Sequence, residues 1–361
     1  MVLVIVLFFT LLLVSSIATF MRRATIDSFI VRNRDAAARA EALARGGVRL
    51  AEALLLEDRL EEEASAEGGF RVESLFDAWG RVRGVDLEPA EDAELYLEIE
   101  DSGARLNLNA LFVDAEEPGG EDPEGSTEGD AETFLREFLK KVIEEMPGRP
   151  EEKLYDVEEL VLDLMDWVDE DETRRRGGLE DEWYQGRTPP YRAANGPLLS
   201  VDELRRVQGF DGRLVEALAP YVVVFPLAPK EKGAGMGVNP NTAPAWVLAL
   251  LWHGDALARE LAKEDEVASI MKEREEGLLC AEGGAGDGGA DAGQPTSAAC
   301  LGLLEAADVD PSTIFPAPTW SSDVFLVTAK ASVGPEIHRT LEVVLDRSDP
   351  ANVRRLAWRM R

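Results

Sequence analysis

Apolar residues fill the first 21 positions of the chain, Met1 to Met21, without a single charged side chain. The run is interrupted only by small hydroxyl residues, Thr10, Ser15, Ser16 and Thr19. A bilayer core of about 30 Å is crossed by roughly 20 apolar residues in an α-helix. A secretory signal instead begins with charge and has a shorter apolar core of about 7–15 residues. The pattern therefore predicts a retained transmembrane helix.

The helical pattern continues without a break to about Glu63. From Thr25 onward the chain is rich in Ala, Leu, Arg and Glu, which are good helix formers. Apolar side chains recur there at roughly helical spacing, at Ala40, Leu43, Ala44, Val48, Leu50, Ala51, Leu54 and Leu55. We expect one helix that joins the membrane segment to a folded core, with Gly46 and Gly47 as points where it can bend.

Strand patterns stand on both sides of the middle of the chain. Residues 95–99 alternate as a strand, and after the turn residues 101–103 the segment 105–109 alternates as its partner would. Near the end of the chain, residues 324–333 and 337–345 read as the two arms of a hairpin joined at Gly-Pro. These segments predict an antiparallel sheet.

A block of helical patterns lies between the strands. Helices are predicted at residues 157–168, 200–208, 212–218, 242–252 and 266–279. Ser200 and Thr242 are suitable N-caps, and Glu203 completes a capping box with Ser200. The order of helix, strands, helical block and strands predicts an α+β fold in which an α-helical domain interrupts a sheet domain.

The chain is strongly acidic, with 70 acidic and 38 basic residues and a formal net charge of −32. Such a surface repels nucleic acid and favours cations or basic partners, or it simply keeps the protein soluble. Residues 114–132 hold nine acidic residues and no basic one, which predicts a disordered loop. The two cysteines, Cys280 and Cys300, flank a Gly-rich loop at 281–294 and form either a disulfide or two buried thiols.

The densest group of candidate ligands begins at Asp166 and continues to Tyr184. Within it Asp169, Asp171, Thr173 and Glu180 take positions 1, 3, 5 and 12 of an EF-hand-like count, and closely spaced carboxylates suit the oxygen-rich coordination of Ca²⁺. Arg174 stands at position 6, where the EF-hand turn requires Gly, so a true EF-hand is excluded. Two interpretations remain open: a looser calcium site, or a solvated acidic turn paired with the arginines at 174–176.

Residues 199–210 and 238–244 look like halves of helix-hairpin-helix units. In the DNA-binding versions the hairpin amides meet phosphate, but here Asp211 lies in that hairpin, and phosphate binding rests on Lys and Arg. A packing module is the favoured interpretation, and a membrane-anchored helix-hairpin-helix DNA receptor is the alternative. The sequence shows no nucleophile motif or phosphate-binding loop and has two histidines, so we predict no enzyme.

Taken together, these segments resemble minor pseudopilin K of the type II secretion system, also called general secretion pathway protein K. The resemblance is carried by the charge-free N-terminal helix, the closing strand pair and four segments: IEDSGARLNLNALF from Ile99, DWVDEDETRRRGGLEDEWY from Asp166, PPYRAANGPLLSVDELRRVQGFDGRLVEALAPYV from Pro189 and VNPNTAPAWVLALL from Val238. Each segment alone is weak, but their order over nearly the whole chain is specific.

The resemblance implies a pilin-like fold with an inserted helical domain. Residues 1–21 would be the transmembrane part of the N-terminal helix and 22–112 the first part of the pilin-like domain. Residues 113–314 would be the inserted α-helical domain, and 315–361 the C-terminal strands and tail. Calcium binding in the inserted domain of family members implicates Asp169, Asp171, Glu180 and Asp181 as metal ligands.

The resemblance also implies a function in assembly. Such a protein caps the tip of the periplasmic pseudopilus, assembles with minor pseudopilins I, J and H, and helps to initiate the fibre that exports folded proteins across the outer membrane. Its helix sits in the inner membrane and its globular part in the periplasm. Ile5 stands where most pilin-type subunits carry a Glu that pairs with a neighbour's N-terminal amine, as expected at a tip. We also expect upstream in-frame codons to encode a basic leader ending in Gly.

Overall fold

The computed structural model describes residues 1–65, 72–82, 84–112, 127–229, 235–255, 258–280, 300–302, 309–349 and 351–361. These residues form two compact units. The first unit contains residues 1–57, 81–99 and 326–361, and the second contains residues 58–80 and 100–325. The predicted Gly-rich loop lies entirely outside the described residues, as does the acidic loop up to residue 126.

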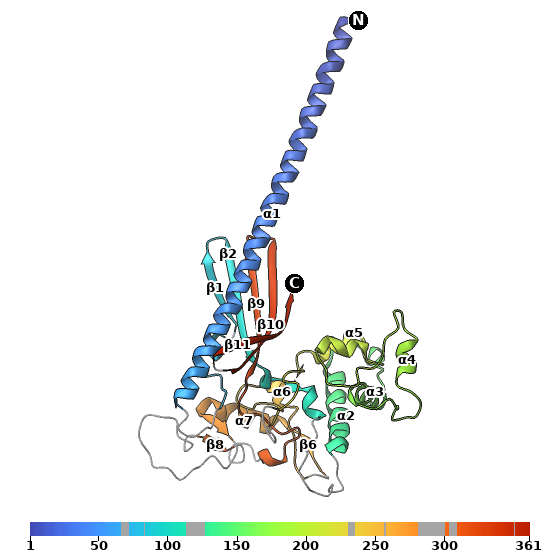
Figure 1. Cartoon of the computed structure of the whole chain (residues 1–361), viewed down its shortest axis with the longest axis vertical. Helices are drawn as coiled ribbons and strands as arrows, with labels where there is room; N and C mark the ends of the chain where they lie inside the picture. The colour runs from blue at the N-terminus through green and yellow to red at the C-terminus, as the bar shows by residue number, and fades with distance from the viewer. Residues whose placement is uncertain are drawn as a thin grey trace. The chain divides into compact units, whose positions relative to one another are not determined.

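One helix, α1 (Val2–Ser65), begins the first unit, so the predicted continuous helix is confirmed. All side chains of residues 1–35 are exposed, and the apolar run is long enough to cross a membrane, with a mean hydropathy of 2.7. Farther along, buried side chains recur on one face, at Ala40, Ala44, Val48, Ala51 and Leu55. The N-terminal half of the helix is therefore free, and its C-terminal half packs on a core (Figure 1).

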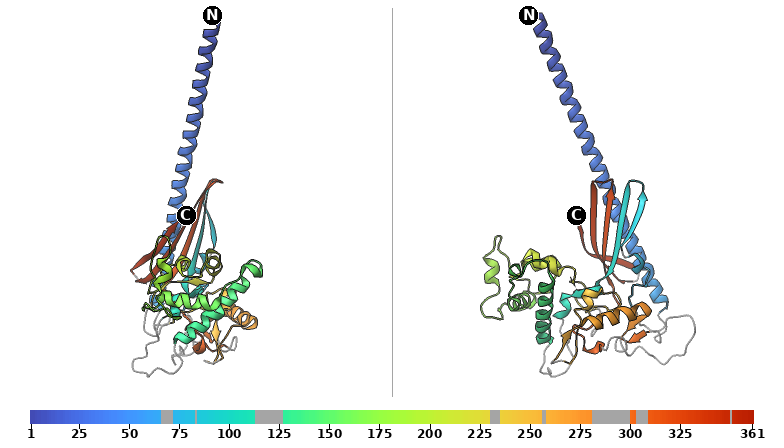
Figure 2. Two further views of the ribbon diagram at one scale, coloured as in Figure 1. Left: turned by 90° about the vertical axis from the view of Figure 1, so that its right-hand side faces the viewer. Right: turned by 180° about the vertical axis from the view of Figure 1, so that it is seen from behind.

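That core is a sheet of five described strands in the order β1-β2-β9-β10-β11. The strands are β1 (Val85–Ala90), β2 (Ala93–Asp101), β9 (Val324–Val333), β10 (Ile337–Asp349) and β11 (Asn352–Met360). β1 pairs with β2 and β10 with β11, both antiparallel, and a short turn joins β9 to β10 as predicted. Figure 2 shows α1 lying along one face of this sheet in two further views.

The second unit contains most of the helices. They are α2 (Thr127–Glu145), α3 (Val157–Val168), α4 (Asp181–Gln185), α5 (Gly212–Leu218), α6 (Ala245–Leu248) and α7 (Glu264–Glu276). Short 3-10 helices are η1 (Gly80–Val82), η2 (Ser102–Ala104), η3 (Leu108–Leu111), η4 (Pro150–Glu152), η5 (Val201–Arg206) and η7 (Pro311–Thr313). Phe134 and Phe138 of α2 and Leu164 of α3 belong to one buried apolar core.

Three pairs of short strands complete the second unit. β3 (Leu106–Asn107) pairs in parallel with β4 (Val222–Val223), and β5 (Trp252–His253) pairs antiparallel with β6 (Glu260–Leu261). The strands that carry the cysteines, β7 (Leu278–Cys280) and β8 (Cys300–Gly302), pair in parallel.

Several predicted elements differ from the observed ones. Residues 105–109 do not pair with residues 95–99, because only β3 is extended and it pairs with β4 instead. The predicted helix at 200–208 is the 3-10 helix η5, and the one at 242–252 shortens to α6. Residues 127–132, predicted in the acidic loop, form the first turns of α2.

Hydrogen bonds between buried polar side chains join the segments around Asp101 and Asn239. Asp101 Oδ2 accepts hydrogen bonds from Thr242 Oγ1 at 2.6 Å and from Asn239 Nδ2 at 3.0 Å, and its Oδ1 accepts from the Gly103 amide at 2.7 Å. Thr242 is thus engaged with Asp101, and Pro244 rather than Thr242 stands at the start of α6. A buried carboxylate with several donors is well satisfied, so these bonds fix the segments to each other.

Candidate metal centre

The chain reverses direction directly after α3. Thr173 and Leu179 form an antiparallel bridge, and the turn between them contains Gly177 and Gly178 with φ of 84° and 102°. Such left-handed angles favour glycine, which explains the Gly-Gly pair in the sequence. The reversal returns Glu180 to the end of α3.

Three carboxylates meet at this point. Asp166 in the last turn of α3, Asp169 at its C-cap and Glu180 each offer one oxygen, and these oxygens lie within 4.8 Å of one another. Glu180 is only 3% exposed, yet neither of its carboxylate oxygens accepts a hydrogen bond from the described residues, and neither does Asp169 Oδ1. Because a buried carboxylate without a partner is costly, the geometry suits a bound cation.

The electrostatics of the cluster also favour a bound cation. Burial, together with the negative charges of Asp169 and Asp166, raises the pKa of Glu180 to about 7. Burial likewise raises the pKa of Asp166 and of Asp169. Three carboxylates at this distance ionise together only when a positive charge stands near them. Hard cations such as Ca²⁺ prefer oxygen ligands of this kind.

Part of that positive charge comes from the protein. Arg175 Nη2 lies 2.9 Å from Asp169 Oδ2, and Arg175 Nε lies 3.4 Å from Asp166 Oδ1. The neighbouring Arg174 Nη2 lies 2.8 Å from Asp163 Oδ1. The arginine run therefore does pair with the acidic turn, while the buried face of Glu180 is left without a donor among the described residues.

The other two predicted ligands have different surroundings. Asp171 is exposed and accepts a hydrogen bond from the Thr173 amide at 2.6 Å, which stabilises the turn. Asp181 Oδ1 accepts from the Ala193 amide at 3.1 Å, and its negative charge also contributes to the raised pKa of Glu180. The structure thus brings Asp169 and Glu180 together and adds Asp166 to them. The spacing of Asp166 and Asp169, one helical turn apart, is the signal in the sequence that could have found it.

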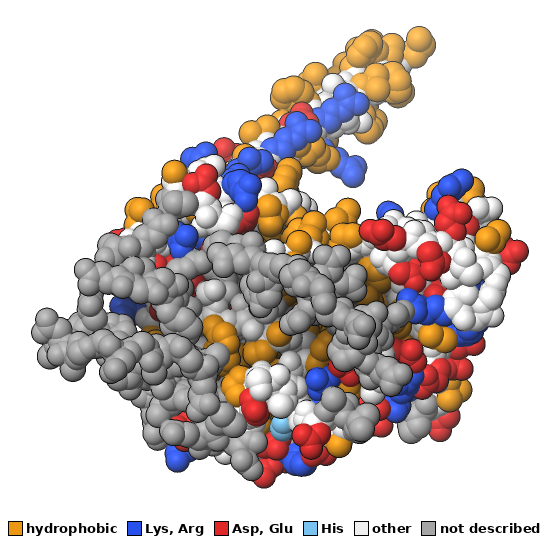
Figure 3. All heavy atoms as spheres, turned by 60° about the horizontal axis from the view of Figure 1, so that its bottom comes forward, with side chains coloured by type: hydrophobic (Ala, Val, Ile, Leu, Met, Phe, Trp, Pro, Cys, Tyr) orange, Lys and Arg blue, Asp and Glu red, His pale blue; other side chains and the backbone are white. Residues whose placement is uncertain are grey.

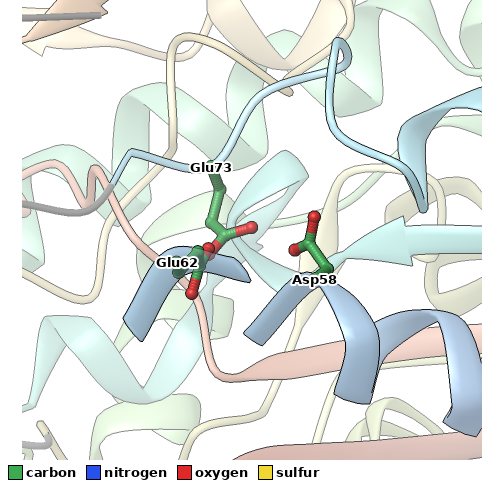
Figure 4. Close-up of side chains that lie close together, drawn as sticks. All are labelled: Asp58, Glu62 and Glu73. Atoms are coloured by element: carbon green, nitrogen blue, oxygen red, sulfur yellow. The ribbon is translucent and has the colours of Figure 1, made fainter. Parts of the chain in front are cut away.

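A second acidic group lies near the end of α1. Asp58 and Glu62 project from adjacent turns of the helix toward the buried Glu73 (Figure 4). Glu73 Oε2 accepts a hydrogen bond from Trp79 Nε1 at 3.2 Å, and Arg59 Nη1 lies 3.6 Å from Glu62. Since side chains of the protein bind these carboxylates, we interpret the group as an internal polar network and assign no ion to it.

The hairpin of the first helix-hairpin-helix-like unit packs closely against α3. Gly209 has a φ of 84°, and a Cβ there would lie 2.8 Å from Leu160 Cδ2 of α3. Asp211 is used inside the unit, because it accepts from the Leu214 amide at 2.8 Å and from the Tyr155 hydroxyl at 3.1 Å. This geometry supports a packing module.

The long helix on an antiparallel sheet defines a pilin-like protein, here with a separate helical unit. The sequence model of the family described as "Type II secretion system (T2SS), protein K" matches residues 104–227. The resemblance to protein K that the sequence predicted is therefore confirmed for these residues.

Curated relatives agree with this assignment. The chain is 34% identical to type II secretion system protein K of Klebsiella pneumoniae over 36% of each chain. It is 33% identical to that of Aeromonas hydrophila over 43% of this chain and 44% of the relative. It is 31% identical to that of Pseudomonas aeruginosa over 59% of this chain and 55% of the relative. The matches thus span between about a third and just over half of these relatives' lengths.

A solved structure shows the same fold over nearly the whole chain. A chain in the crystal structure of the GspK-GspI-GspJ complex from the enterotoxigenic Escherichia coli type 2 secretion system matches with a TM-score of 0.57. The match covers 92% of this chain and 99% of the other, at 22% sequence identity. At that identity the likeness establishes the fold.

Proposed function

We propose that the whole chain is a minor pseudopilin of the type II secretion system, of the K type. It caps the tip of the periplasmic pseudopilus and helps to initiate its assembly with minor pseudopilins I, J and H. The observation that carries the proposal is the combination of a pilin-like helix-and-sheet unit with a helical unit whose residues 104–227 match protein K. The solved relative is found with GspI and GspJ, which supports I and J as partners.

The apolar end of α1 is followed by basic side chains (Figure 3), beginning at Arg22 and Arg23. Basic residues beside a span by themselves favour the cytoplasmic side, so the location proposed here rests on the likeness to protein K. We infer that residues 1–21 lie in the inner membrane and that the folded units lie in the periplasm. In lipid the apolar helix is stable alone, and in a fibre the same surface packs against neighbouring subunits.

Co-purification tests the assembly. A chain that starts at residue 25 loses no buried side chain, because every side chain before residue 36 is exposed. We expect this soluble chain to elute as one complex with the soluble parts of the I and J pseudopilins from the same organism. Absence of a complex, together with measurable binding of duplex DNA, would instead favour the DNA receptor.

We further propose that the acidic cluster of Asp166, Asp169 and Glu180 binds Ca²⁺. The support is the group of buried carboxylate oxygens without a donor among the described residues. Three carboxylates provide only part of the 6–8 oxygen ligands that Ca²⁺ takes, so main-chain oxygens or water would complete the site. Asp171 and Asp181 add negative charge near Glu180, which would attract the cation to the site.

Thermal unfolding tests this site. We expect calcium to raise the melting temperature relative to EDTA, because an ion that binds only the folded state stabilises it. The isosteric change Glu180→Gln should remove most of that rise. The control Glu182→Gln removes the same charge from an exposed position two residues away and should keep the rise. Superimposable curves for the parent chain with EDTA and with calcium would contradict the proposal.

A further inference from the structure

We infer that Arg175 is an internal competitor for the cation at Asp166, Asp169 and Glu180, and that it sets the affinity of the site. The inference rests on the proposed cation site and adds a residue that acts against the cation. Its guanidinium contacts two of the carboxylates that a divalent ion would bind, Asp169 through Oδ2 and Asp166 through Oδ1, while Asp169 Oδ1 has no hydrogen-bond donor among the described residues.

The contacts of Arg175 allow a cation to replace its guanidinium at the carboxylates. Nη2 lies 2.9 Å from Asp169 Oδ2 and Nε lies 3.4 Å from Asp166 Oδ1, so the guanidinium bridges two of the three carboxylates. The side chains of Arg175 and Asp169 are 26% and 24% exposed, so the guanidinium can withdraw into water without opening the core. The Arg175 amide separately donates to Asp166 Oδ1 at 3.2 Å, which holds the backbone when the side chain moves.

The two neighbouring arginines have other roles. Arg174 bonds to Asp163 at 2.8 Å and lies 3.9 Å from Asp166. Arg176 Nη1 lies 2.6 Å from Glu159 Oε1, on an earlier turn of α3. Among the ion pairs of the described residues, Arg175 is therefore the arginine that reaches Asp169. Arg176 offers a control with the same charge at the next position.

Repulsion between two positive groups at the same carboxylates is the basis of the competition. Two positive groups in contact with one carboxylate repel each other strongly where water is partly excluded. Binding of the cation therefore displaces Arg175 or weakens its contact, and the two bind Asp169 with reciprocal coupling. Without a cation, Arg175 relieves the repulsion among the three carboxylates. Removal of its side chain should destabilise the cation-free protein and tighten cation binding.

Calorimetric titration of the full chain in detergent with CaCl₂ tests the inference. Arg175→Ala should lower the Kd for calcium by about tenfold, within the usual range for coupled sites. Arg176→Ala, which removes the same charge, should leave the Kd within about twofold, because screening weakens the effect of more distant charges. Melting in EDTA gives an independent readout, since Arg175→Ala should lower the melting temperature there and increase the rise produced by calcium.

The outcomes separate the two proposals. Equal affinities for Arg175→Ala and Arg176→Ala, or weaker binding by Arg175→Ala, would overturn the inference and leave the calcium site standing. Binding of calcium by Arg175→Ala but not by the parent chain would support it. If neither chain binds calcium, the cation site itself is wrong and the inference is wrong with it. Arg175→Gln, which keeps a polar side chain without the charge, replaces the alanine variant if that variant fails to fold.

Discussion

Gly46 and Gly47 are adjacent in α1, yet they face different surroundings. A Cβ added at Gly47 would lie 3.2 Å from Ala329 Cβ and from Leu95 Cδ1, whereas one added at Gly46 would have nothing within 4 Å. The helix continues through both residues, so close packing on the sheet, rather than a bend, accounts for the glycine at 47.

This difference gives opposite expectations for two alanine variants. Gly46→Ala should stabilise the protein by about 0.5–1 kcal/mol, because alanine favours the helix interior. Gly47→Ala should instead destabilise it by about 1–3 kcal/mol, because the added methyl group overpacks the contact with the sheet. Chemical unfolding of the soluble chain from residue 25 measures both. A shift of the same sign and size in the two variants would contradict the packing argument.

The candidate site shows which ligands can be predicted from residue spacing and which cannot. Asp169 and Glu180 could be proposed from the sequence because carboxylates spaced along one loop suit a cation. Asp166 begins the same acidic run but was not among the predicted ligands, since it lies inside an amphipathic helix where acidic residues are common. Glu180 lies near Asp166 and Asp169 because the chain reverses at the bridge between Thr173 and Leu179. No local sequence pattern specifies that bridge.

At the scale of the element, local patterns succeed where packing follows one helical face. The predicted helices at 157–168 and 212–218 match α3 and α5 residue for residue, because a periodic apolar stripe and an Asp N-cap are both written in the local sequence. The strands at 324–333 and 337–345 were found for a similar reason. Alternation and a Gly-Pro turn are short-range signals.

Elements held by distant side chains could not be predicted in this way. Glu203 was expected to cap its own helix, but its carboxylate accepts from Trp167 Nε1 at 3.0 Å and from the Leu199 amide at 2.9 Å. Asn109 bonds to the backbone of Leu198 and Val224, which fixes residues 108–111 in a 3-10 turn instead of a strand. Tertiary bonds override local propensity in these segments.

The edge strands were missed for a different reason. β1 contains Asp86, Glu88 and Pro89, and β11 contains three arginines, at 354, 355 and 359, so neither strand alternates cleanly. Both lie at the edges of the sheet, where one side of the strand needs no partner and polar residues are tolerated. The fold class was therefore predictable, and the full width of the sheet was not.

At the scale of the whole molecule, each unit exposes apolar side chains, but in different patterns. In the first unit Ile26, Phe29 and Ile30 are exposed at helical spacing on α1, between the membrane segment and the part packed on the sheet. In the second unit the exposed large apolar side chains are widely spaced along the sequence, at Leu60, Phe76, Leu154, Leu179, Leu199, Leu227 and Trp246. A contiguous apolar stripe suits a partner helix better than a single exposed side chain does.

If the pseudopilin partners bind the first unit, charge placed on that stripe should prevent assembly. Phe29→Glu, at a side chain that is 57% exposed, should abolish co-elution of the soluble chain with the I and J pseudopilins and leave its melting temperature nearly unchanged. Leu154→Glu, at a residue that is 85% exposed in the second unit, adds the same charge and should leave the complex intact. Loss of the complex with Leu154→Glu but not with Phe29→Glu would move the partner surface to the helical unit. In that case the pilin-like unit could not be the part that joins the fibre.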